Sequence, residues 1–191
     1  MHDSLYRQLL GEAYGRLPAP LQAMHDMREP ARAHGIATVE RGHGLMPGLI
    51  GWVFGFPDSG DNVPLTVSFT KDRGREIWER DFAGKRLRSI QELGRGRQRG
   101  QLIERFGPFA FSMAAQVRNQ QLCLDVSGAW FAGVPLPSIL HPRALAFEHD
   151  ADGRFNFHVE LGLPLVGRLV RYSGWLEPVV LPGGNSESEA L

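Results

Sequence analysis

From Val63 onward, apolar and polar residues alternate in short runs that are separated by turn residues. Such alternation places one set of side chains on each face of a β-strand, and tight turns between the runs are typical of antiparallel pairing. About ten strands are expected, and an antiparallel sheet of this size curls or closes to protect its edges. We therefore predict an α+β protein that is mainly antiparallel β, with its strands in a strongly curved half-barrel or barrel-like sheet.

Apolar residues at helical spacing are found near the N-terminus. Ser4 is placed to cap a first short helix, and residues 18–27 repeat the helical pattern before a strand at residues 35–42. The sequence thus predicts two N-terminal helices that precede the sheet.

A third helix is expected after the first strand, because residues 45–56 are apolar on every side and Pro47 suits a first helical turn. We expect this helix to be buried, with its glycines allowing the sheet to come close. The alternative is a lid or a membrane-touching element that exposes Trp52 and Phe54.

Three hairpins can be aligned from their turns, since the turn length fixes which residues lie opposite each other. Two-residue turns are expected at residues 73–74 and 119–120, and a three-residue loop at residues 151–153. The expected pairs are Phe69 with Trp78, Val67 with Arg80 and Leu65 with Phe82; Val117 with Leu122, Ala115 with Leu124, Met113 with Val126 and Phe109 with Trp130; and His149 with Phe155, Phe147 with Phe157 and Leu145 with Val159.

Two strands place a charge on their apolar face. Arg80 lies between Trp78 and Phe82, and Glu104 is flanked in the same way by Leu102 and Phe106. An unpaired buried charge is costly, so the arginine and the glutamate are expected to pair with each other or to meet a ligand.

Composition and charge exclude several classes of protein. Basic and acidic residues balance at 21 each, so no global field recruits nucleic acid. The first residues lack a basic region followed by an apolar stretch, so we expect no secretory signal and a cytoplasmic protein. Residues 1–181 are expected to form one domain, and residues 182–191 a disordered acidic tail.

Motifs for chemistry are missing. The sequence contains no nucleophile turn, no His or Cys ligand pair at metal-binding spacing and no glycine-rich dinucleotide loop. We therefore predict no catalytic residues, no metal and no cofactor, and an enzyme is the less favoured interpretation.

Four segments carry a family resemblance: residues 37–42, the Trp78-x-Arg80-x-Phe82 strand, residues 104–108 and residues 163–178. With them, residues 5–178 resemble a bacterial family catalogued as domain of unknown function number 4166. In that family the module occurs alone or attached to a nucleotide-dependent reductase or epimerase-like domain. The resemblance implies a self-contained accessory module, and it supplies no activity, catalytic residue or cofactor.

The favoured hypothesis is a module that binds a hydrophobic or amphipathic small molecule inside the curved sheet, with Arg80 holding an acidic head group. A second is an accessory module whose apolar helix and proline-bearing loops, residues 134–140 and 163–167, dock on a partner enzyme; contact with a membrane surface is less favoured. A third is an enzyme acting on a lipid-like substrate through Glu104 or His149. The candidate ligand-binding residues are Trp78, Arg80, Phe82, Glu104, Phe106, His149, Phe157 and Tyr172.

Overall fold

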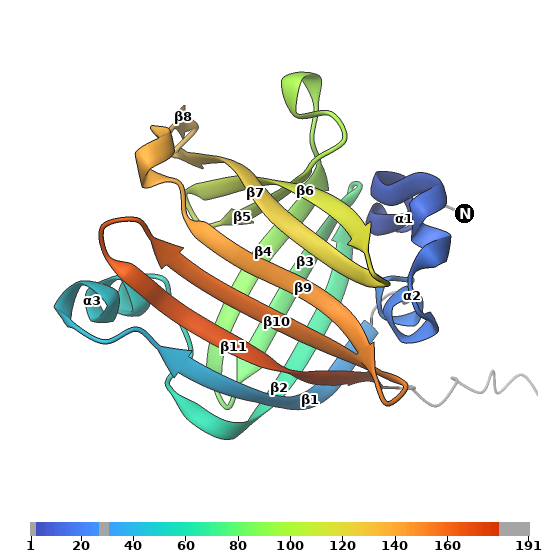
Figure 1. Cartoon of the computed structure of the whole chain (residues 1–191), viewed down its shortest axis with the longest axis horizontal. Coiled ribbons are helices and arrows are strands. Elements are labelled where there is room, and N and C mark those ends of the chain that lie inside the picture. The colour runs from blue at the N-terminus through green and yellow to red at the C-terminus, as the bar shows by residue number, and fades with distance from the viewer. Residues whose placement is uncertain (1–2, 27–30, 180–191) are drawn as a thin grey trace, which may run out of the picture.

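The computed structural model describes residues 3–26 and 31–179, and its strands form one closed antiparallel barrel (Figure 1). Strands that are consecutive in the barrel pair in turn, and β6 also pairs with β7, which closes the ring. The ring consists of β1 (Ala31–Arg41), β2 (Gly60–Asp72), β3 (Arg75–Phe82), β4 (Lys85–Leu93), β5 (Leu102–Phe106), β6 (Phe109–Arg118), β7 (Gln121–Phe131), β9 (Arg143–Ala151), β10 (Arg154–Leu163) and β11 (Gly167–Pro178). The short strand β8 (Val134–Pro135) pairs only with β7, outside the ring. The predicted fold class is confirmed.

The first two predicted hairpins are confirmed at their turns. Residues 73–74 and 119–120 both take positive φ, as a two-residue type I′ turn requires, and the expected pairs follow from them. One pair of the second hairpin differs, because a bulge shifts the register between Ser112 and Met113 and places Phe109 opposite Phe131 instead of Trp130.

The third hairpin was predicted with the wrong loop length. Asp152 and Gly153 both take positive φ and form a two-residue turn, so Ala151 pairs with Arg154 and His149 lies opposite Asn156. A register shift of one residue moves every side chain of β9 to the other face of the sheet. Glu148 therefore lies opposite Phe157, on the inner face, and His149 lies on the outer face.

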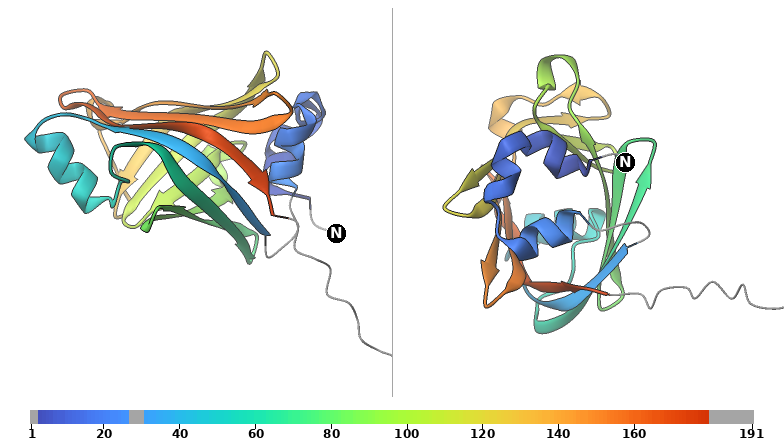
Figure 2. Two further views of the ribbon diagram at one scale, coloured as in Figure 1. Left: turned by 90° about the horizontal axis from the view of Figure 1, so that it is seen from below. Right: turned by 90° about the vertical axis from the view of Figure 1, so that its right-hand side faces the viewer.

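One end of the barrel is closed by the N-terminal helices (Figure 2). These are α1 (Leu5–Leu10), a 3-10 helix η1 (Gly11–Arg16) and α2 (Ala19–His25), and Ser4 caps α1 by accepting a hydrogen bond from the Arg7 N–H. Their inward side chains belong to the core. Buried residues of this plug are Leu5, Tyr6, Tyr14, Leu17, Leu21 and Met24.

The plug is also tied together by ionic contacts at Asp26. Its carboxylate pairs with Arg7 and accepts a hydrogen bond from the Ser4 hydroxyl at 2.9 Å. Burial alone would raise the pKa of Asp26, but hydrogen bonds from Arg7 and Ser4 outweigh it and hold the pKa below its usual range.

Because the pKa of Asp26 is lower in the folded state than in the unfolded state, its contribution to stability is present at neutral pH and is lost as the pH falls through the folded-state value. We expect Asp26→Asn to lower the free energy of unfolding by about 1 kcal/mol at pH 7, and the difference from the wild type to vanish near the acid limit. Urea unfolding of both proteins across acidic pH measures this. A difference that stays constant with pH would contradict the assignment.

At the opposite end of the barrel lies α3 (Leu45–Val53), which follows β1 (Figures 1 and 2). It is not the buried helix that was expected. Pro47 and Gly51 are buried, but Leu45 is 93% exposed and Trp52 is 78% exposed. Of its glycines, Gly51 makes a close approach, and the contact is with the Arg41 guanidinium, not with the backbone of the sheet. The exposed alternative therefore describes Trp52 correctly, whereas Phe54 is half-buried, packs against the core and lines the cavity.

The wall of the barrel is weakest between β7 and β9. Only three residue pairs join these strands, from Leu122 with Glu148 to Leu124 with Ala146. Beyond them the strands part, and an outer hollow of about 440 Å³ lies there, lined by Asp125, Val126, Pro142, Arg143, Ala144, Leu145 and Glu160.

In the described ranges, every helix is too short or too polar to cross a bilayer. The tail expected at residues 182–191 lies outside those ranges.

Candidate functional site

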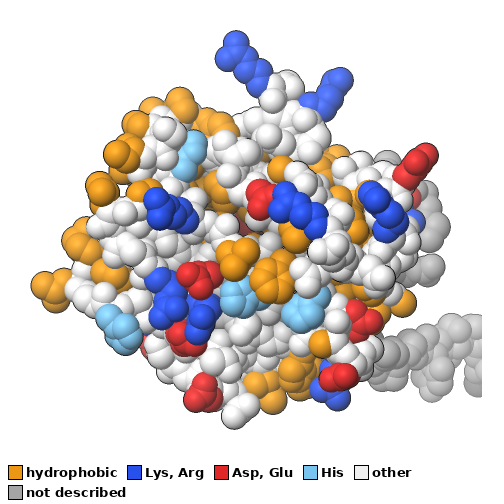
Figure 3. All heavy atoms as spheres, viewed as in Figure 1, with side chains coloured by type: hydrophobic (Ala, Val, Ile, Leu, Met, Phe, Trp, Pro, Cys, Tyr) orange, Lys and Arg blue, Asp and Glu red, His pale blue; other side chains and the backbone are white. Residues whose placement is uncertain are grey.

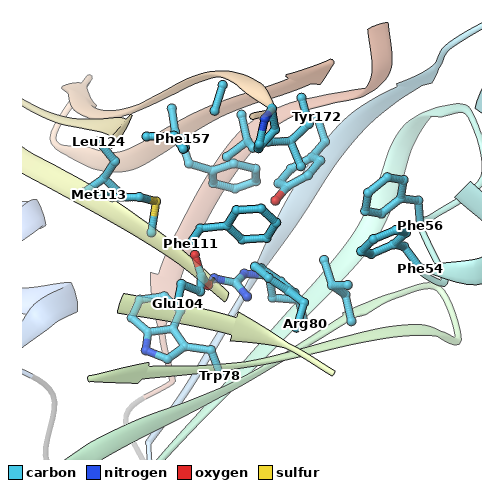
Figure 4. Close-up of a pocket in the computed structure, with 18 of the residues that line it drawn as sticks. Phe54, Phe56, Trp78, Arg80, Glu104, Phe111, Met113, Leu124, Phe157 and Tyr172 are labelled. Carbon is cyan, nitrogen blue, oxygen red and sulfur yellow. Dashed lines mark hydrogen bonds and ion pairs between the residues drawn. The ribbon is translucent and has the colours of Figure 1, made fainter. Parts of the chain in front are cut away.

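The barrel encloses a cavity of about 500 Å³ that is lined almost entirely by apolar side chains (Figure 4). It runs from Tyr6 in the plug to Ile50 and Phe54 beside α3. Phe131 and Leu140 line it and are also nearly half exposed, so the cavity reaches the surface at the α3 end. Its size lies in the range of about 300–1,000 Å³ that is usual for small-molecule sites.

A cluster of polar side chains interrupts this lining toward the plugged end. Arg80 donates to the Ser89 hydroxyl at 2.9 Å and forms an ion pair with Glu104 at 3.5 Å. Gln91 donates to the same Glu104 oxygen at 3.1 Å, and its carbonyl accepts a hydrogen bond from Tyr6 at 3.2 Å. The charges are thus held by neutral partners as well as by each other, as buried charges require.

The three adjacent strands β3, β4 and β5 supply this cluster. Arg80 lies on β3, Ser89 and Gln91 on β4, and Glu104 on β5, where it pairs directly with Gln91. Alternation along each strand turns these side chains inward together with their apolar neighbours. The predicted meeting of Arg80 and Glu104 is found in the structure.

Hydrogen-bonding capacity is left over on the cavity wall. The hydroxyl of Tyr172 points away from Phe54 and Phe56 and toward Phe111, on the side of the chamber that holds Arg80 (Figure 4). Among the described residues, Arg80 and Gln91 both donate to Oε1 of Glu104, which leaves Oε2 available to a donor from a ligand. Burial raises the pKa of Tyr172, with Glu104 acting in the same direction and Arg80 opposing it, so its hydroxyl keeps its proton and can donate.

The electrostatics of the plugged end are dominated by carboxylates. Burial raises the pKa of Tyr6 well above its usual value, and the nearby Glu148, Glu104 and Glu76 raise it further, against the single opposing charge of Arg80. Glu148 contacts Nε2 of the buried His25 at 2.6 Å. A further anion placed here would face three carboxylates.

Comparison with known proteins places the chain at the level of a family. The model of a family described as domain of unknown function (DUF4166) matches residues 17–176, nearly the whole chain. The protein belongs to the DUF4166 family. No curated protein and no solved structure matches it. The expected resemblance is confirmed, and the interpretation of this DUF4166 protein rests on its own geometry.

In this DUF4166 protein the cavity brings together most of the candidate residues predicted from the sequence. His149 is the exception, because the corrected register of β9 places it on the outer face, where its ring lies 5.6 Å from that of Phe147. An enzyme that uses His149 inside the barrel is therefore not supported. The candidate residues that line the cavity are Trp78, Arg80, Phe82, Glu104, Phe106, Phe157 and Tyr172.

Sequence reasoning missed the partners that complete the polar cluster. Ser89 and Gln91 are two residues apart on β4, and both are buried on its inner face. Their spacing was visible in the sequence, but no turn signal fixed the register of β4 and so its inner face. The expected pairing of Phe147 and His149 on the apolar face implied that Glu148, between them, would lie on the outer face. His25 contacts it across 123 residues of chain, so no local pattern could connect the two.

Metal chemistry has no support from the geometry. Among residues 3–26 and 31–179, no group of three His, Cys, Asp or Glu side chains is arranged to hold a metal ion.

Proposed function

We propose that this DUF4166 protein binds a largely apolar small molecule that has one neutral polar end. The observation that carries the proposal is the cavity itself, an apolar chamber of about 500 Å³ whose wall carries one local polar cluster of Arg80, Gln91 and Glu104. Such sites hold the body of a ligand by burial of apolar surface and orient it by a few polar contacts.

The polar cluster indicates which head group fits. Arg80 already faces Glu104 and donates to Ser89, so its charge is largely used within the protein. A carboxylate head group would gain contact with Arg80 but would also approach Glu104 and the other carboxylates of the plugged end. An alcohol, ketone or amide avoids this repulsion, can accept from Tyr172 or Arg80, and can donate to Glu104 when it carries a hydrogen. The ligand proposed from the structure is therefore neutral, in place of the acid expected from the sequence.

The proposal predicts selective displacement of a neutral apolar dye. Nile red is expected to bind in the cavity, and 1-dodecanol is expected to displace it at a concentration about tenfold lower than dodecanoate, because the two share a chain and differ in charge. Dye fluorescence measures the displacement. Native mass spectrometry of the freshly purified protein, followed by denaturation, identifies any ligand acquired during expression.

A matched pair of variants tests whether the dye is inside the barrel. Ala146 lines the cavity, whereas its neighbour Leu145 points outward and is 56% exposed. Ala146→Trp should fill the chamber and reduce dye binding by about tenfold or more, while Leu145→Trp should leave it unchanged. Equal effects of the two substitutions, or dye binding that survives Ala146→Trp, would overturn the proposal.

A further inference from the structure

The end of the barrel that carries α3 gathers almost all of the exposed large apolar side chains. Of those in the described residues, all but Leu145 and Val179 lie there. They come from α3, from the end of β7 and the connection after it that contains β8 and the 3-10 helix η3 (Ser138–Leu140), and from the turn between β10 and β11. We call this set the apolar tip: Leu45, Met46, Leu49, Trp52, Val53, Phe131, Val134, Ile139, Leu140 and Leu165. Figure 3 shows hydrophobic side chains along this edge of the molecule.

Isolated apolar residues on a surface are normal, but a gathering of this kind marks an interaction site. The helix α3 has no charged residue from Leu45 to Val53. Its Ile50 packs against the core, and its outward face is apolar as well. Packing inside the protein therefore explains one face of the helix and leaves the other without a partner.

The tip surrounds the place where the cavity reaches the surface. Phe131 and Leu140 belong to both, since each lines the cavity and is nearly half exposed. The apolar wall of the chamber is thus continuous with the apolar outer surface. A folded protein that covered the whole tip would also cover this opening, whereas the acyl chains of a bilayer would extend the apolar medium up to it.

Cationic side chains lie behind the tip. Arg143 follows the cavity-lining Pro142, is exposed, and forms no ion pair with any other described residue. Arg86, close to Gly55 at the end of α3, has an 82% exposed side chain, although it also pairs with Asp81 at 3.3 Å. Arginines in this position suit phosphate groups above a layer of inserted apolar residues.

We infer that the apolar tip docks on the surface of a lipid bilayer, with α3 lying in the interface and the opening of the cavity turned toward the acyl chains. Docking itself requires no ligand. A docked barrel would let an apolar molecule pass between the bilayer and the cavity without crossing water. This second part of the inference rests on the proposed function.

Flotation with vesicles tests the docking. The probes are vesicles of phosphatidylcholine alone and of phosphatidylcholine with phosphatidylglycerol. The wild type is expected to float with both, and more strongly with the anionic mixture, because Arg143 adds an unpaired charge. Leu49→Glu is expected to weaken partitioning by about tenfold or more. Its control is Leu145→Glu, at 56% exposure against 55% for Leu49 but away from the tip, which should change partitioning by less than about twofold.

Several outcomes would overturn the inference. In the first, the wild type does not float with either kind of vesicle. In the second, Leu49→Glu and Leu145→Glu weaken vesicle binding equally. In the third, vesicles never bind, and sedimentation without lipid shows a dimer that Leu49→Glu dissociates. The last result would assign the tip to a second copy of the chain.

Failure of docking is distinguishable from failure of the proposed function. The Ala146→Trp variant, whose cavity is filled, should still float with vesicles, and Leu49→Glu should still bind Nile red. Floating protein that never binds the dye would contradict only the proposed function. Dye-binding protein that never floats would contradict only the docking.

Discussion

Replacing Arg80 by leucine is expected to lower the free energy of unfolding by about 3 kcal/mol. The substitution removes the only cation in contact with Glu104 among the described residues, and the carboxylate remains in a cavity wall with Gln91 as its single donor. Stranding one partner of a buried pair costs more than losing the pair, because desolvation of the remaining charge is no longer offset. Urea denaturation followed by tryptophan fluorescence measures the change.

Two further variants define what the pair does. Arg80→Leu combined with Glu104→Leu should recover most of the lost stability, since no charge is then left alone. Arg88→Leu is the control, because Arg88 on β4 and Glu79 on β3 form an exposed pair at 3.8 Å on the outer face. Its loss should cost no more than about 0.5 kcal/mol. Additive losses in the double variant would show that Arg80 and Glu104 do not act as a pair.

The same double variant separates a structural pair from a ligand contact. If the polar cluster orients the polar end of the ligand, the stable double variant should bind Nile red but lose the preference for 1-dodecanol over dodecanoate. If that preference persists, the pair serves only to fix the strands.

Tyr6→Ala is expected to have an effect of similar size, about 3–5 kcal/mol, at the plugged end. The ring of Tyr6 is 1% exposed, lies 3.9 Å from that of His25 and closes the cavity beside the polar cluster. Its removal leaves a hole between the helices and the barrel, and Gln91 loses the donor for its carbonyl oxygen. Urea denaturation measures the loss, and hydrogen exchange should show the amides of α1 and α2 opening first.

The matched control is Tyr6→Phe, which keeps the ring and removes only the hydroxyl. It should cost about 1 kcal/mol through the lost hydrogen bond to Gln91. A cost below about 1 kcal/mol for Tyr6→Ala would mean that the helices only cover the barrel and do not stabilise it.

The strand registers could be predicted from the sequence where a turn and the alternation of apolar residues agreed. The turn at residues 73–74 was readable because glycine stands at its second position and because only one loop length matched the apolar faces of β2 and β3. That register also placed Arg80 on the inner face, together with Trp78 and Phe82. These three residues of the candidate site could therefore be predicted from the alternation of apolar and polar residues.

The register of β9 was misread for a physical reason. Leu145 is more apolar than Ala144 and Ala146, yet it is 56% exposed while the two alanines line the cavity. A strand that faces an open chamber does not need large side chains, so the more hydrophobic face is not the inner one. Hydrophobic alternation indicates a packed core, and here part of the interior is space.

The helix α3 shows a second limit of sequence reasoning. A segment that is apolar on every side is equally compatible with burial in a core and with contact to an apolar medium outside the protein. The choice depends on what lies beyond the chain, which the residues of α3 do not encode.

The short pairing between β7 and β9 has a consequence for the size of guest that the barrel admits. A closed ring of strands can widen only where two neighbouring strands separate, at a seam of the barrel. A seam resists this when many backbone hydrogen bonds would have to break. Here three residue pairs hold one seam, and Val126, Pro142 and Ala144 line both the inner chamber and the hollow outside it. Fewer residue pairs would have to separate here than at any other seam of the ring, so we expect the wall to widen along this line when a bulky guest is bound.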